Sequence, residues 1–189
     1  MLTALLIVFA LIFGSALLLI VFAIALYNGL VRQRNLVEEG WSGIDVQLRR
    51  RFNLIGNLVS SVKGYMKQES EVLTRVTEMR TALNSDDPRE RGKAEAQVST
   101  ALANVLAVAE DYPELKSNET FLQLQDELSA LEDHIQRARR YYNGAVRDFN
   151  TSCQSFPAVL FAAGFGFHPA DFFELDDDAQ RAAPAVEFS

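Results

Sequence analysis

Few side chains in this chain have the chemistry to hold a metal ion. The two histidines, His134 and His168, fall on separate segments, and His168 has no partner at a ligand spacing. A di-iron site in a helical bundle requires Glu-x-x-His on its helices. The segment Leu131–His134 lacks the glutamate at the required place, and His134 lies beside an apolar stripe, as a surface helix residue would. The sequence therefore predicts no metal site.

Signals for nucleophilic or phosphate chemistry are equally weak. A nucleophile requires a base and an orienting group, and Cys153 has no sequence sign of such activation. The Gly-Phe-Gly around Phe165 lacks the strand, the helix and the lysine of a phosphate-binding loop. A formal net charge of −7 and the lack of a basic, aromatic platform argue against nucleic-acid binding. We therefore predict that the chain is not an enzyme and takes neither a cofactor nor nucleic acid.

A group of polar residues near the start of the first helical segment is the main candidate for a functional surface. Its members are Asp45, Gln47, Arg50, Arg51 and Asn57. Two interpretations are open, namely structural hydrogen bonds inside a helical bundle and an assembly contact with a subunit or partner. For the basic run Arg49–Arg51 we expect a solvated helix face rather than contact with an anionic membrane.

Helical periodicity supplies the elements that must position these residues. One stripe alternates steps of three and four residues without a break, as in a helix of a bundle or coiled coil. This stripe is Phe121, Leu124, Leu128, Leu131, Ile135, Ala138, Tyr142, Ala145 and Phe149. An earlier stripe is Val37, Trp41, Ile44, Leu48, Phe52, Ile55, Val59, Val62 and Met66, then Leu73, Val76 and Leu83, and a shorter one is Ala94, Val98, Ala101, Val105, Val108 and Tyr112. No series of strands is visible, so an all-α bundle is expected over residues 28–153.

The helix boundaries leave the number of bundle helices open. Asp87 can cap a helix that starts at Pro88, and Ser117 or Asn118 can cap the next one. If the first segment turns near Ser70, four antiparallel helices alternate up and down. If it continues unbroken, three long helices do so.

The first part of the chain is apolar enough to cross a membrane. Leu2–Leu26 carries no charge and is diluted only by one Thr, one Gly and one Ser. As a helix these residues rise about 37 Å, against a hydrocarbon core of about 30 Å. The segment Ala23–Ala25 looks like a signal-peptidase site, but no basic residue precedes the run. We therefore predict a retained transmembrane anchor at residues 1–27.

Basic residues predict the orientation of this anchor. None precedes the apolar run, whereas Arg32 and Arg34 follow it closely. Because cytoplasmic flanks carry the excess of Lys and Arg, we expect a short N-terminus outside and the C-terminal domain in the cytoplasm. Arg32 and Arg34 are also candidates for contact with the membrane surface. The single Cys153 permits no internal disulfide, which fits a reducing compartment.

The tail at residues 154–189 is apolar first and then acidic. Its apolar part is too short to span a membrane and too apolar to be left in water. It can cover its own bundle, lie in a membrane interface or dock on a neighbouring subunit. The candidate docking residues are Phe156, Phe161, Phe165, Phe167, Phe172 and Phe173.

Ordered motifs along nearly the whole chain resemble the LemA family. They are Tyr27–Val31, Trp41–Leu48, Arg50-Arg51, Asn57–Val59, Val62–Tyr65, Ala109–Pro113, Phe121–Gln125, Ala138–Asn143 and Phe156-Pro157. One departure is Gly56, where the family more often has proline. The resemblance implies one N-terminal membrane helix, a four-helix bundle, bacterial origin and a cytoplasmic domain at the inner membrane. It supplies no reaction, and one branch of the family is associated with building magnetosome membranes.

These observations predict a membrane-anchored helical scaffold that self-assembles and organises or shapes the membrane, without catalytic activity. Its expected partners are membrane lipid and further copies of itself. The alternative is an adaptor on the cytoplasmic face that recruits a membrane enzyme, a protease or a signalling protein. The sequence does not identify such a protein partner.

Overall fold

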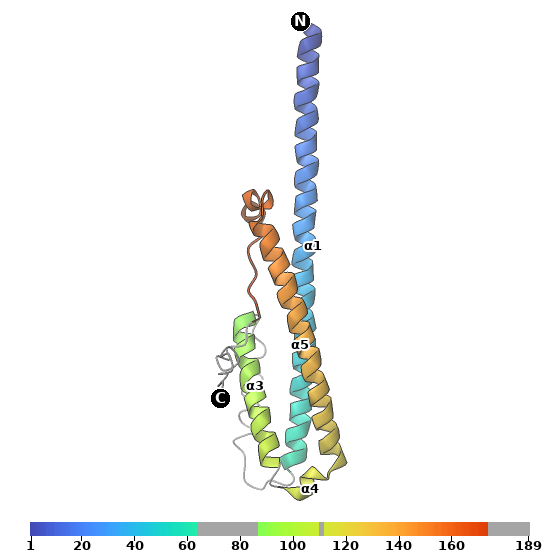
Figure 1. Cartoon of the computed structure of the whole chain (residues 1–189), viewed down its shortest axis with the longest axis vertical. Coiled ribbons are helices and arrows are strands. Elements are labelled where there is room, and N and C mark those ends of the chain that lie inside the picture. Colours follow the sequence, from blue (N-terminus) through green and yellow to red (C-terminus); the bar gives the residue numbers. More distant parts are fainter. Residues whose placement is uncertain (64–86, 110–111, 174–189) are drawn as a thin grey trace, which may run out of the picture. The chain divides into compact units, whose positions relative to one another are not determined.

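The computed structural model of this chain describes residues 1–63, 87–109 and 112–173, and within these ranges no residue forms a β-strand. The elements are α1 (Leu2–Lys63), α3 (Pro88–Ala109), α4 (Pro113–Lys116), α5 (Glu119–Gln154) and the 3-10 turns η1 (Ala158–Leu160) and η2 (Ala163–Phe165) (Figure 1). The all-α class is confirmed. The expected break near Ser70 lies outside the described residues, as does the chain beyond Phe173.

The chain forms two compact units. The first consists of Met1–Glu39 and Gly144–Ala170, and the second of Gly40–Asn143 and Asp171–Ser189. Both α1 and α5 therefore contribute residues to each unit. The predicted division into an anchor (residues 1–27), a bundle (28–153) and a tail (154–189) stays a prediction. It divides the chain by the role of each part, whereas the two units are defined by their compactness.

The second unit is a helical bundle with an apolar core. α1, α3 and α5 bury side chains at the steps of three and four residues that an amphipathic helix requires. The buried core side chains include Ile44, Leu48, Ile55 and Leu58 from α1, Ala94 and Val98 from α3, and Phe121, Leu124, Leu128, Leu131 and Ile135 from α5. Most members of the predicted stripes are thus buried or half-buried where the structure describes them, but Tyr112, predicted at the end of the third stripe, is 37% exposed because the helix α3 ends before it, at Ala109.

Within this unit α1 and α3 run in the same direction. Asp45 of α1 contacts Arg91 of α3, and further along both helices Arg51 contacts Glu95. Figure 1 shows α5 running against both. A parallel α1 and α3 is the direction that the four-helix alternative requires, since three alternating helices would place them antiparallel. The connection between the two helices lies outside the described residues.

Local caps fix where two of the helices begin. The backbone N–H of Arg89 donates to Oδ1 of Asp87 at 2.8 Å, and α3 begins at Pro88. The backbone N–H of Phe121 donates to Oδ1 of Asn118 at 3.1 Å, at the start of α5. These bonds satisfy amide groups that have no partner in the first turn of a helix. The cap predicted at Asp87 is confirmed, and of the two candidates for α5 Asn118 supplies the cap.

Gly40 permits a close approach of α1 to the backbone of α5 in this unit. A Cβ on Gly40 would lie 3.0 Å from Cα of Tyr142 and 3.2 Å from Cδ1 of Tyr141, whereas a Cβ on Gly43 meets nothing within 4 Å. Overpacking costs about 1–3 kcal/mol, and replacing a helical glycine by alanine gains roughly 1 kcal/mol. Alanine at Gly40 would combine the gain in helix propensity with the cost of overpacking, whereas alanine at Gly43 would bring the gain alone.

We therefore expect Gly40→Ala to lower the free energy of unfolding by about 1 kcal/mol and Gly43→Ala to raise it by up to about 1 kcal/mol. The measurement is urea unfolding of the full chain in detergent, followed by the fluorescence of Trp41, the only tryptophan. Equal shifts in the two variants would contradict a close helix contact at Gly40.

The first unit carries the apolar run as an exposed helix. α1 contains an 18-residue window of mean hydropathy 3.1, and no part of that window is buried. Length and composition therefore suit a membrane-crossing helix, as the sequence predicted. In the same unit η1 and η2 follow the end of α5 (Figure 1).

Candidate functional site

The main concentration of buried charge in the described residues lies among α1, α3 and α5 of the second unit. Arg51 is 6% exposed and Glu95 is 3% exposed. Nη1 of Arg51 donates to Oε1 of Glu95 and lies 2.9 Å from Oε2 of Glu132. Nη2 of Arg51 donates to Oγ of Ser99 at 3.1 Å. One arginine of α1 thereby joins two residues of α3 and one of α5.

Helical spacing explains why these charges are buried. Arg51 lies three residues after Leu48 and four before Ile55, so it shares the core face of α1. Glu95 lies three residues before Val98 and likewise shares the core face of α3. Buried charges at such positions are tolerated only when they are paired, and here each is paired with a residue of another helix.

The carboxyl of Glu95 has an unusual proton affinity. Burial raises its pKa from 4.5 to about 7, although the positive charges of Arg51 and Arg139 oppose the shift. The carboxylate of Glu132 raises the pKa further. Two carboxylates compete for the same nitrogen of Arg51 in a poorly solvated place, so a proton on one of them relieves the repulsion. The cluster therefore binds a proton near neutral pH.

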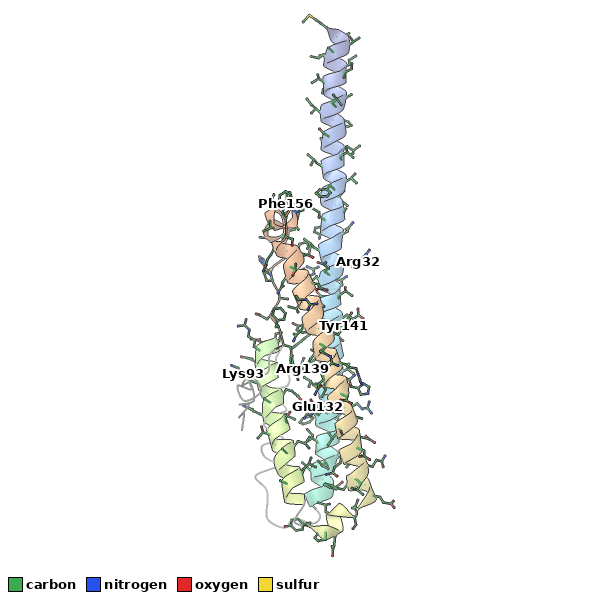
Figure 2. All side chains as sticks on the ribbon, viewed as in Figure 1. Arg32, Lys93, Glu132, Arg139, Tyr141 and Phe156 are labelled. Atoms are coloured by element: carbon green, nitrogen blue, oxygen red, sulfur yellow. The ribbon has the colours of Figure 1, made fainter. Side chains whose placement is uncertain are left out.

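Arg139 lies at the edge of this cluster. Burial lowers its pKa, while Glu95 and Glu132 act in the opposite direction. Its guanidinium carbon lies 5.4 Å from the ring centroid of Phe173, within the range of a cation–π contact. Figure 2 marks Glu132 and Arg139 on the same helix, α5. Arg139 thus links the buried charges to the segment that follows η2.

A second charged cluster lies nearer the start of the bundle. Oδ1 of Asp45 accepts a hydrogen bond from Nη2 of Arg91, and Oδ2 of Asp45 lies 2.8 Å from Nε of Arg49. The guanidinium of Arg91 also lies over the ring of Trp41, 4.9 Å from its centroid. This geometry lets one buried arginine pair with a carboxylate and stack on an aromatic face at once.

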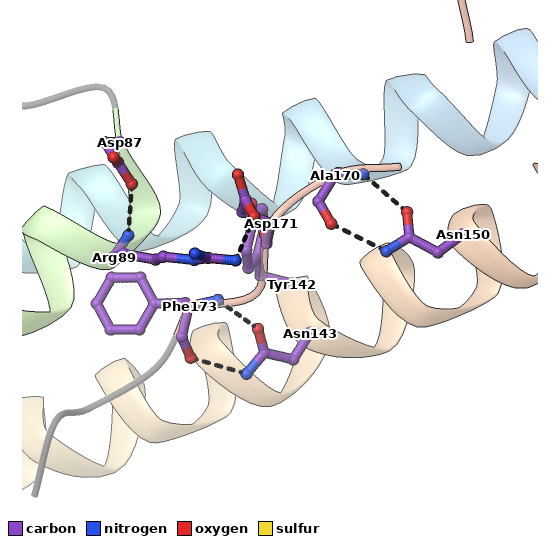
Figure 3. Close-up of polar contacts among 8 residues, drawn as sticks. All are labelled: Asp87, Arg89, Tyr142, Asn143, Asn150, Ala170, Asp171 and Phe173. Atoms are coloured by element: carbon purple, nitrogen blue, oxygen red, sulfur yellow. Dashed lines mark hydrogen bonds and ion pairs between the residues drawn. The ribbon is translucent and has the colours of Figure 1, made fainter. Parts of the chain in front are cut away.

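Two asparagines of α5 hold the segment after η2 by its backbone (Figure 3). Nδ2 of Asn143 donates to the carbonyl of Phe173 and its Oδ1 accepts from the N–H of Phe173, at 3.1 and 2.9 Å. Asn150 makes the same pair of bonds with Ala170, at 2.9 and 2.8 Å.

Asp171 of this segment is held from two further sides (Figure 3). The hydroxyl of Tyr142 donates to its carbonyl oxygen at 2.8 Å, and Nη2 of Arg89 lies 2.8 Å from its Oδ1. Burial, with a smaller contribution from the charge of Asp171, raises the pKa of Tyr142 to about 12. Tyr142 is therefore a hydrogen-bond donor at all physiological pH values.

This arrangement can hold helices and bind a proton, but it offers little else chemically. In the part of the chain that the structure describes, no three His, Cys, Asp or Glu side chains group as metal ligands would. Cys153 is buried near the end of α5, and burial raises the pKa of its thiol, which disfavours the reactive thiolate.

The predicted polar surface divides between the core and the exterior. Asp45 and Arg51 make the ion pairs described above, Gln47 is half-buried, and Arg50 and Asn57 are exposed. The expectation that Arg49–Arg51 forms one solvated face is wrong for Arg51. Because Arg51 follows Leu48 by three residues, it turns inward, while Arg49 and Arg50 stay outside.

The predicted membrane-contact and tail residues divide in a similar way. Arg32 and Arg34 are exposed. Nε of Arg34 lies 3.7 Å from Oε1 of Glu38, and the guanidinium carbon of Arg34 lies 5.5 Å from the ring centroid of Phe167. Of the tail aromatics, two are buried and four are exposed. The buried ones are Phe167 and Phe173, and the exposed ones are Phe156, Phe161, Phe165 and Phe172.

Several members of the site do not stand out in the sequence. Arg91 and Glu95 each lie three residues before a buried residue of the α3 stripe, Ala94 and Val98 respectively. A search of the sequence for charged residues at the helical spacing of an apolar stripe would therefore find both. Arg139, four residues after Ile135 and three before Tyr142, is likewise in phase with the stripe of α5, whereas the two asparagine contacts have no such signal. Their partners lie about 20 to 30 residues away in the sequence, in a segment without periodic structure.

Fold and site together define a helical-bundle protein with an apolar N-terminal helix and an internal charge network. The sequence model described as the LemA family matches residues 40–188, and the chain belongs to that family.

The chain is also similar to individual proteins, one of which carries the family's name. The chain is 29% identical to "Protein LemA" of Metamycoplasma hominis over 131 residues, covering 68% of this chain and 60% of the relative. It is 25% identical to "Magnetosome protein MamQ 2" of Paramagnetospirillum magneticum, covering 78% of this chain and 64% of that protein. It is 23% identical to "Magnetosome protein MamQ" of Magnetospirillum gryphiswaldense, with the same coverage. The chain thus spans less than two thirds of each of these relatives.

Proposed function

We propose that this chain is a membrane-anchored helical scaffold that self-assembles through its bundle and organises or shapes the membrane. The observation that carries the proposal is that α1, a single helix from Leu2 to Lys63, contains both the apolar run and one wall of the bundle. No loop separates the apolar run from the part of α1 that packs in the bundle. A bundle attached in this way suits a component of a membrane-bound assembly, and two relatives are named as magnetosome proteins.

The surface proposed for assembly is the outer stripe of α1 in the second unit. Val46, Arg50, Asn53 and Asn57 recur at steps of three and four residues and are all exposed. Val46 is a large apolar side chain that is 57% exposed among polar neighbours. An apolar residue framed by polar ones is the usual composition of a contact between subunits. This stripe retains Arg50 and Asn57 from the predicted surface, and the inward-facing Arg51 is left out of it.

The proposed orientation places the bundle in the cytoplasm at the inner membrane, with the short N-terminus outside. Arg32 and Arg34, both exposed and directly beyond the apolar run, support it through the excess of basic residues on cytoplasmic flanks. Reporter fusions at the two ends of the chain test this placement. A cytoplasmic N-terminus would contradict it.

The test of self-assembly is the mass of the full chain in mild detergent. We expect a defined oligomer that Val46→Glu converts to monomers. Leu122→Glu is the matched control, since Leu122 of α5 is also a large apolar side chain and is 44% exposed. Wild-type protein that is monomeric at all concentrations would overturn the scaffold. Crosslinking in cells would then test the adaptor, which predicts one dominant foreign protein instead of self-crosslinks.

A further inference from the structure

The segment between α5 and Ala170 exposes an unusual amount of apolar surface in the first unit. No charged residue occurs in residues 149–167. Phe156 is 80% exposed and Leu160 is 67% exposed, the highest values among the large apolar side chains that the structure describes beyond the apolar run. Val159, Phe161 and Phe165 are exposed as well. Residues 155–167 are called the apolar knob below.

The apolar knob is a built structure. The N–H groups of Phe161 and Ala162 donate to the carbonyl of Ala158 at 2.9 and 2.8 Å, and the N–H of Phe167 donates to the carbonyl of Ala162 at 2.9 Å. The chain turns at Gly166, whose φ of 78° suits glycine. Ala158 and Ala162 are buried inside the knob, whereas large apolar side chains such as Phe156 and Leu160 lie on its outside.

Both ends of the knob are tied to α5. It begins directly after α5, and beyond its end Ala170 is held by the two hydrogen bonds of Asn150. Phe167, buried at the knob's base, lies 6.4 Å from Phe149, centroid to centroid. Because the backbone of this segment is already fixed, its exposed side chains can bind a partner without the entropy cost of ordering a loop.

The position of the knob along α1 points to its partner. The ring of Tyr27 lies 5.5 Å from that of Phe165 and 5.4 Å from that of Phe167. Tyr27 directly follows the apolar run Leu2–Leu26. Tyrosine is enriched where a membrane helix leaves the hydrocarbon, so with α1 across a membrane the knob would lie at the depth of the membrane–water interface. Arg34, near the base of the knob at Phe167, lies on the water side of that level.

We propose that the apolar knob inserts into the interfacial layer of the membrane that α1 crosses, in the leaflet where α1 emerges. Phe156, Leu160 and Phe161 are the inserted side chains, and lipid acyl chains are their partner. Each chain then contacts one leaflet at two points, the helix and a wedge beside it, which adds volume to that leaflet alone. The inference rests on the membrane anchor within the proposed function and does not depend on self-assembly.

The test places a fluorescent label on the knob of the full chain. Leu160→Cys and, separately, Phe156→Cys are made with Cys153→Ser, labelled with a polarity-sensitive dye and reconstituted into phosphatidylcholine–phosphatidylglycerol vesicles. The matched control is Leu122→Cys, an exposed leucine on the bundle. Trp41 emission equal to that of the wild type confirms that each labelled chain is folded.

We expect nitroxide-labelled lipid to quench the dye at Leu160→Cys and Phe156→Cys, with roughly fivefold less quenching by aqueous iodide than at Leu122→Cys. Iodide access equal to that of the control would overturn the inference. Protection from both quenchers would also overturn it, because a second copy or another protein would then cover the knob. The oligomeric mass is measured separately, so a failure here is distinguishable from a failure of self-assembly.

Discussion

Replacing Arg51 by methionine is expected to destabilise the bundle by about 3–5 kcal/mol, because the change leaves two carboxylates without their shared cation. Glu95 is 3% exposed and cannot recover hydration in place of the lost ion pair. Methionine keeps an unbranched apolar side chain at the site, so the effect reports the charge rather than a large cavity. The measurement is urea unfolding of the full chain in detergent, followed by Trp41 fluorescence.

Arg50→Met is the matched control for this prediction. Arg50 is the adjacent residue of the same helix and is exposed, so its loss should change the free energy of unfolding by no more than about 0.5 kcal/mol. Combining Arg51→Met with Glu95→Gln should recover part of the loss, since the buried carboxylate is then absent as well. An Arg51→Met variant as stable as Arg50→Met would show that the buried network does not stabilise the bundle.

The second large effect is a dependence of stability on pH that arises from Glu95. Its pKa in the folded chain is about 7, against 4.5 as the ordinary value. Between these values the folded chain binds more protons than the unfolded chain, so the free energy of unfolding falls as pH rises. The contribution of Glu95 is fully present below about pH 4.5 and is lost as pH rises through 7. Its full size is about 3 kcal/mol.

Glu95→Gln isolates this contribution. We expect unfolding of the wild type in urea to become easier from pH 5 to pH 8 relative to Glu95→Gln, since the amide does not titrate. Groups that titrate elsewhere in the chain are the same in both proteins, so their contributions cancel in the difference. A constant difference between the two proteins across this range would contradict a raised pKa for Glu95.

The same result bears on how the bundle responds to its surroundings. At mildly acidic pH Glu95 is protonated, and Arg51 keeps the ion pair with Glu132. At alkaline pH both carboxylates are charged and compete for Arg51. The three helices are therefore held more firmly when the proton is present, which makes the core of the bundle sensitive to the surrounding pH.

The sequence by itself determined the helices and the face that each of them buries. The alternation of three and four residues from Phe121 to Phe149 follows from the helical period, so the buried residues of α5 can be read without tertiary information. The uncharged run Leu2–Leu26 and the cap at Asp87 are also local in origin, because length, composition and adjacent hydrogen-bonding groups decide them.

The tertiary structure alone decided which charges meet and which surfaces stay exposed. Helical phase turns Arg51, one of three consecutive arginines, toward the core, but only the packing of α3 and α5 decides that its partners are Glu95 and Glu132. The tail has no periodic pattern, so its course depends on distant hydrogen bonds such as those from Asn143. Pairing energies depend on distance and desolvation across helices, and a linear sequence specifies neither until the helices pack.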